Sequence, residues 1–130
     1  MLVVEQRSNR TYVPISEVVI LCRDEEVRDM VVYWIASSGV MASVAKDGHD
    51  AARILRNGCA RLLITDRMLP PWPGLGTFRD IKHRHHGLRI AVIEDPSREA
   101  SVLGQRVGAD MVLETPLRHA DVLFLTALPK

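Results

Sequence analysis

The regular alternation of two hydrophobic patterns along this chain is the feature that most constrains its fold. Short apolar or alternating runs, at residues 18–22, 40–45, 62–64, 89–93 and 111–113, are typical of strands in a well-covered sheet. After each run, apolar residues recur every three or four positions, which is the spacing of one helical face. Five strands that alternate with five helices predict an α/β domain with a parallel sheet covered on both faces.

The expected strand order places the functional residues. For five strands, the flavodoxin-like, doubly wound order 2-1-3-4-5 is the natural one, and function lies beyond the carboxyl ends of the strands, near the switch point between the first and third. The residues that follow these strand ends are Cys22, Arg23 and Asp24, then Asp66, then Glu94, and finally Glu114 and Thr115.

Composition narrows the class of protein. The 130 residues suit one domain, which we place at residues 16–127 after an N-terminal tail at 1–15. The net charge of +1 gives no general attraction to nucleic acid or anionic membrane. We expect a cytoplasmic protein for three reasons. The chain has only two cysteines, it has no basic-then-apolar leader, and it has no apolar run of membrane-spanning length.

Four segments give the chain a family resemblance. They are Lys-Asp-Gly at 46–48, Leu-Leu-Ile-Thr-Asp at 62–66 with Met-Leu-Pro at 68–70, Val-Gly-Ala-Asp at 107–110, and Thr-Pro-Leu at 115–117. At these spacings, residues 17–125 resemble the CheY-like receiver domains of two-component response regulators. The resemblance implies that Asp66 accepts a phosphoryl group from a histidine kinase or phosphotransfer protein in a phosphorelay. It also implies output through a downstream protein partner, no catalytic turnover beyond self-dephosphorylation, and homodimers through the fourth helix, fifth strand and fifth helix.

The chain departs from the family at the metal site. The family's acidic pair, which holds Mg²⁺, falls on Cys22 and Arg23, and Asp24 is acidic but one step late. The remaining possible ligands are the Asp66 carboxylate, the Met68 carbonyl and Asp24, so we expect Mg²⁺ to bind weakly if it binds. We hypothesise that the Arg23 guanidinium instead pairs with Asp66 and fills the space of the metal.

The groups that contact the phosphoryl oxygens in the family also differ here. The hydroxyl position falls on Glu94 or Ile93, the lysine position on Thr115, and the aromatic position of the fifth strand on Val112. A Glu94 side chain that faces the pocket would oppose a phosphoryl group, which carries roughly −1.5 to −2 charges. The pocket is therefore an atypical, degenerate form of the family's.

Several of these residues have simpler structural interpretations. Asp66 can be a strand-end residue that caps a loop, Asp24 the N-cap of the first helix, Cys22 a small buried side chain, and Glu94 a solvated loop residue. Trp34 lies on the inward face of the first predicted helix. The basic run at residues 82–86 suits the C-terminal end of a helix.

Three functions follow from these observations. The first is a signal-transduction receiver domain that is phosphorylated on Asp66 and acts through protein contacts. The second is a phosphorylation-independent interaction module that keeps the receiver fold for its surface. The third, a flavin- or nucleotide-binding protein, is disfavoured because acidic residues stand where a phosphate-binding loop would follow the first strand. Because the sequence ends soon after the last predicted helix, we expect either that output passes through another protein or that this chain is one piece of a larger architecture.

Overall fold

The computed structural model describes residues 17–57, 60–66, 77–95 and 108–126. Five strands and four helices lie within these ranges. In chain order they are β1 (Val18–Leu21), α1 (Glu25–Ser37), β2 (Ala42–Val44), α2 (Gly48–Asn57), β3 (Leu62–Thr65), α3 (Thr77–Arg84), β4 (Arg89–Glu94), β5 (Met111–Glu114) and α5 (His119–Thr126). The tail at 1–15, the Met68 carbonyl and the helix expected between 95 and 108 lie outside the described residues.

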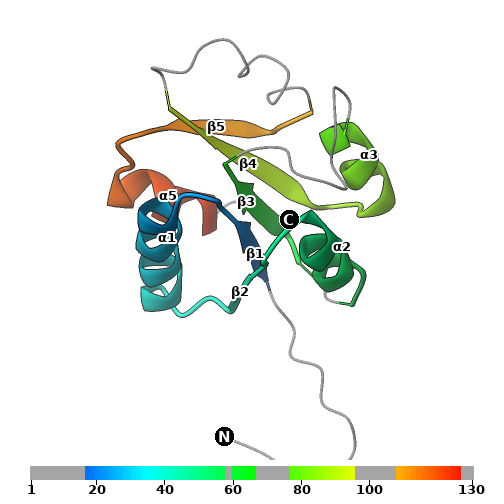
Figure 1. Cartoon of the computed structure of the whole chain (residues 1–130), viewed down its shortest axis with the longest axis horizontal. Coiled ribbons are helices and arrows are strands. Elements are labelled where there is room, and N and C mark those ends of the chain that lie inside the picture. Colours follow the sequence, from blue (N-terminus) through cyan, green and yellow to red (C-terminus); the bar gives the residue numbers. More distant parts are fainter. Residues whose placement is uncertain (1–16, 58–59, 67–76, 96–107, 127–130) are drawn as a thin grey trace, which may run out of the picture.

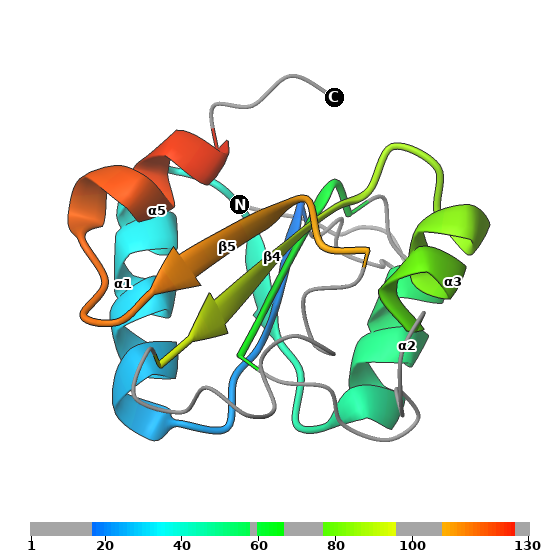
Figure 2. The ribbon, with the colours of Figure 1, turned by 90° about the horizontal axis from the view of Figure 1, so that it is seen from above.

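The five strands form one parallel sheet in the order β2-β1-β3-β4-β5, as predicted. In Figures 1 and 2, α1 and α5 cover one face of this sheet, and α2 and α3 lie side by side on the other. The doubly wound α/β fold is therefore confirmed. All strands point the same way, so the sheet has a carboxyl edge and an amino edge, named here after the strand ends that lie there.

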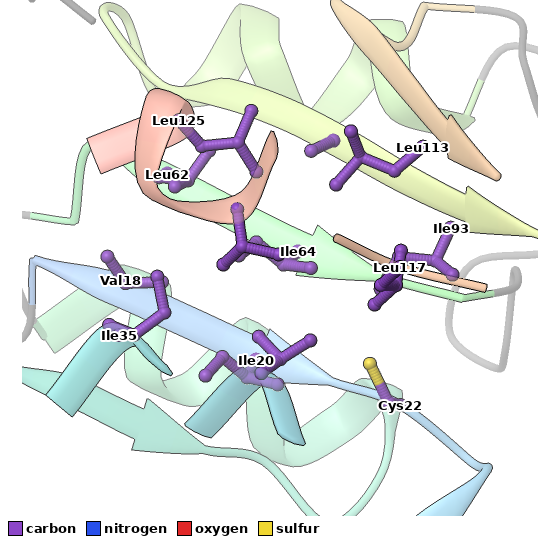
Figure 3. Packing of buried hydrophobic residues seen from close by; sticks show 13 residues of the cluster. Val18, Ile20, Cys22, Ile35, Leu62, Ile64, Ile93, Leu113, Leu117 and Leu125 are labelled. Carbon is purple, nitrogen blue, oxygen red and sulfur yellow. The ribbon is translucent and has the colours of Figure 1, made fainter. Parts of the chain in front are cut away.

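The alternation of side chains along each strand divides the core in two. Val18, Ile20 and Cys22 face the cluster under α1 and α5, whereas Val19 and Leu21 face the cluster under α2 and α3. Figure 3 shows the first cluster, where Cys22 continues the line of Val18 and Ile20 along β1. Because β1, β3 and β4 are covered on both faces, their sequences are almost wholly apolar.

Helix α1 ends as its sequence indicates, and its inward face contacts α5. Gly39 has φ of 85°, a left-handed conformation that glycine adopts without a steric penalty. Trp34 is partly buried against the first cluster, and its ring stacks on His119 at the start of α5 with 5.2 Å between centroids. Among the described residues, no helix is long and apolar enough to cross a membrane.

The turn that leads into β5 is fixed to α3 and β4. Gly108 has φ of 88°, and a Cβ atom there would lie 2.7 Å from the main-chain nitrogen of Arg79. Asp110 accepts a hydrogen bond from the Ile90 N–H at 2.8 Å and pairs with the Lys82 ammonium. The close approach of two chain segments explains why glycine and aspartate occupy these positions.

Candidate functional site

The ends of β1 and β3 meet at the carboxyl edge, as the sequence predicts. Leu21 pairs with Thr65 in the parallel register, so Cys22 and Asp66 come level as the strands end. The Asp66 N–H donates to the Leu21 carbonyl at 3.3 Å, which continues the ladder one step past β3. A carboxylate is thereby held where the two chain segments converge.

The two oxygens of the Asp66 carboxylate have different surroundings. Oδ2 accepts hydrogen bonds from the main-chain N–H of Arg23 at 2.8 Å and of Asp24 at 3.1 Å. Oδ1 is buried and has no hydrogen-bond partner among the residues that the structure describes. Burying a carboxylate oxygen without a partner costs folding free energy. A hydrogen-bond donor, a cation or a covalent bond at Oδ1 would remove that cost.

The contact between Arg23 and Asp66 exists, but not through the group we expected. The Arg23 side chain is exposed, and its guanidinium forms no ion pair or hydrogen bond with any residue in the described ranges. The hypothesis that this guanidinium fills the space of a metal is therefore wrong for this structure. The main-chain N–H of Arg23 makes the contact with Oδ2, and the charged side chain extends into solvent, where it is hydrated.

Asp24 is the N-cap of α1, as one of its two interpretations held. Its Oδ1 accepts hydrogen bonds from the Glu26 N–H at 3.0 Å and the Val27 N–H at 3.2 Å. Its own main-chain N–H points the other way, to Asp66. Asp24 thus donates its main-chain N–H to Asp66, while its own carboxylate caps the N-terminus of α1.

Cys22 is a core residue. Its side chain is 6% exposed and belongs to the cluster under α1 and α5. Burial, followed by the neighbouring Asp66 carboxylate, raises the pKa of the Cys22 thiol well above its ordinary value. The thiol stays protonated at neutral pH, so it is neither a nucleophile nor a metal ligand in this state.

The remaining predicted positions lie farther along the same edge. Thr65 pairs with Val92, so the β4 residue level with Asp66 is Ile93, which is buried in the first cluster. Glu94, the next residue, is buried, and alternation directs it to the opposite face of the sheet from Ile93. The Thr115 N–H donates a hydrogen bond to the Glu94 main-chain carbonyl at 2.9 Å. The Val112 side chain, on β5, is exposed.

Few side chains at this edge, among the residues that the structure describes, are placed to hold Mg²⁺. This ion takes six oxygens in near-octahedral geometry. Among the residues that the structure describes, no three His, Cys, Asp or Glu side chains are grouped as possible metal ligands. Oδ1 of Asp24 caps α1, the Cys22 thiol is buried and protonated, and Oδ1 of Asp66 is the donor that remains at the centre.

Sequence reasoning missed the two main-chain donors, because it considered side chains alone. A signal for them was present. Asp24 as an N-cap places the first turn of α1 directly after β1, and orphan N–H groups at a helix start favour a nearby carboxylate.

Comparisons with known proteins find relatives of this chain and solved structures that share its fold. No family model matches the chain. It is 27% identical over 111 residues to the Regulator of RpoS of Escherichia coli K12, covering 84% of this chain and 33% of that protein. It is 25% identical over 108 residues to the transcriptional regulatory protein CpxR of Klebsiella pneumoniae, covering 83% of this chain and 46% of that protein. The chain thus spans less than half the length of these curated relatives.

The solved structures agree on the fold. The receiver domain of NtrX from Brucella abortus superposes with a TM-score of 0.69 at 22% identity, covering 84% of this chain and 93% of that one. The shared fold is that of CheY-like receiver domains, as the sequence motifs predicted.

Proposed function

We propose that this chain, which has the receiver fold, is a signal-transduction domain of the response-regulator type in which Asp66 accepts a phosphoryl group. The donor would be a histidine kinase or phosphotransfer protein, and the response would pass to a protein partner in the cytoplasm through surface contacts. In this proposal the domain does not turn over a substrate and does not contact nucleic acid directly. The observation that carries the proposal is the asymmetric Asp66 carboxylate, with Oδ2 anchored and Oδ1 without a partner.

The anchored carboxylate suits acyl phosphate formation. Oδ1 attacks the phosphorus, a P–O bond forms, and the P–N bond of a phosphohistidine breaks with its electron pair leaving on the imidazole. Oδ2 becomes the carbonyl oxygen of the mixed anhydride and can still accept the N–H groups of Arg23 and Asp24. The positive end of α1 then faces the new negative charge and supplies part of the stabilisation that cations give elsewhere.

A phosphorylation-independent interaction module is the second candidate. Two observations support it. Cys22 is a buried core residue at a position where the family has an acid. The β4 residue level with Asp66 is Ile93, whose side chain has no hydroxyl group to contact a phosphoryl oxygen. The exposed side chains of Val112 on β5 and Phe124 on α5 offer apolar contact area in either case, including area for the expected homodimer.

The two candidates separate in one experiment. The chain is treated with acetyl phosphate, with and without Mg²⁺, and its intact mass is measured beside a standard receiver. We expect one added phosphate, lost in Asp66→Ala and retained in Glu114→Gln, which changes an exposed acid at the same edge. If the standard receiver is labelled and this chain is not, phosphorylation is rejected and the second candidate stands. Retention of the adduct in Asp66→Ala would reject Asp66 as the acceptor.

A further inference from the structure

Two helix ends bring basic side chains together at the amino edge, far from Asp66 along the strands. α2 carries Arg56 in its last turn, and α3 ends in Lys82, His83 and Arg84, followed by His85 and His86. The two helices lie side by side (Figures 1 and 2). Each runs back antiparallel to the strands, so their C-terminal ends both lie beyond the amino edge.

Some cations on these helices are already paired, and others are not. Lys82 pairs with Asp110, and Arg53 pairs with Asp50 within α2. Arg56 and Arg84 are exposed, and neither forms an ion pair or a side-chain hydrogen bond within the described parts of the chain. Two guanidinium groups are therefore available to an anion.

The unpaired Arg56 and Arg84 are both near enough to His85 for their charges to act on it. After burial, the charges of Arg84 and Arg56 lower the pKa of the His85 imidazole, and they come from different helices. The rings of His83 and His86 meet edge to face, with 6.4 Å between centroids. The helix dipoles favour basic side chains here, but each helix end carries only about half a negative charge, so a positive surface remains.

We propose that this basic surface, made of Arg56, His83, Arg84, His85 and His86, binds an acidic segment of a protein partner. The two guanidinium groups would each grip a carboxylate, which their planar donor geometry suits. The site is small and the whole chain has a net charge of only +1. The opposite edge is acidic, with Asp24, Glu25, Glu26, Glu94, Asp95 and Glu114 beyond or at the strand ends.

This distribution of charge favours a short peptide over a larger polyanion. A nucleic acid duplex or an anionic bilayer gains affinity by neutralising many phosphates, and its extended field would also reach the acidic edge. A short acidic segment contacts the basic surface alone. Such a surface does not depend on phosphorylation of Asp66, although it agrees with a domain that acts through protein contacts.

The test measures binding of a fluorescently labelled oligo-glutamate peptide to the full chain by anisotropy at low ionic strength. We expect R56Q/R84Q to bind at least about tenfold more weakly, because two charge-assisted contacts are lost. The matched control is R28Q/R118Q, which removes the same charge from two arginines that pair with acids on α1 and α5. It should bind the peptide as the unchanged chain does.

A second readout follows His85 by NMR. Bound carboxylates offset the charges of Arg84 and Arg56, so the peptide should raise the pKa of His85. Equal weakening by both double variants, no binding by the unchanged chain, or no change in the His85 pKa would each reject the proposal. Tighter binding of single-stranded DNA or phosphatidylserine vesicles, lost in R56Q/R84Q, would reject the peptide as the partner class. Asp66→Ala should bind the peptide normally, so this test fails or succeeds separately from phosphorylation.

Discussion

The two edges of the sheet are built by different means. At the carboxyl edge, Asp66 is held by the main-chain N–H groups of Arg23 and Asp24, so its place does not depend on which side chains those residues carry. At the amino edge, the turn into β5 depends on side-chain identity. The Asp110 carboxylate pairs with Lys82 and accepts from the Ile90 N–H, and Gly108 leaves no Cβ to collide with Arg79. A site held by the main chain can keep its geometry while its charged side chains change, which fits the atypical residues around Asp66.

Restoring an acid at the carboxyl edge should have the largest effect. Cys22→Asp puts a carboxylate into a core position beside Asp66, and we expect unfolding free energy to fall by roughly 3 kcal/mol because the charge is buried and unpaired. Urea unfolding measures the change, and the cost should shrink at acidic pH, where the new carboxyl is protonated.

Cys22→Asn is the control, since it has the same shape without the charge. If both variants lose the same stability, charge is not what the edge excludes. If Mg²⁺ restores the stability of Cys22→Asp alone, this edge binds a cation once a second carboxylate is present.

A smaller loss is expected at the amino edge from Gly108→Ala. The new Cβ would lie 2.7 Å from the Arg79 nitrogen and 3.0 Å from Cβ of Phe78, at a φ that disfavours alanine. We expect a loss of about 2 to 3 kcal/mol in thermal or urea unfolding. Gly39→Ala is the matched control, since its φ is 85° and nothing lies within 4 Å of the added atom. It should cost only about 1 kcal/mol; equal losses would show that packing against α3 contributes nothing.

The smallest effect concerns the N-cap. Asp24→Ala removes the acceptor of the Glu26 and Val27 N–H groups and should cost about 1 kcal/mol. Asp24→Ser should recover most of it. Since the main-chain N–H of residue 24 is unchanged, the acetyl phosphate reaction at Asp66 should persist in both variants. Loss of that reaction in Asp24→Ala alone would mean that the cap side chain, and not only the main chain, positions Asp66.

The sequence determined the fold almost completely, because burial on both faces of β1, β3 and β4 leaves runs of apolar residues that nothing else requires. It also placed Asp66 after the third strand, and the expected order 2-1-3-4-5, which the structure confirms, puts that strand end at the switch point. The role of Arg23 could not be found this way: its contact with Asp66 spans 43 residues and uses the main chain, which every residue other than proline has. The burial of Cys22 was one of its two interpretations from the sequence, and the structure confirms it. The tertiary structure decided which atom of Arg23 meets Asp66 and that Arg56 and Arg84 share one surface, because both depend on how separate segments are aligned in space.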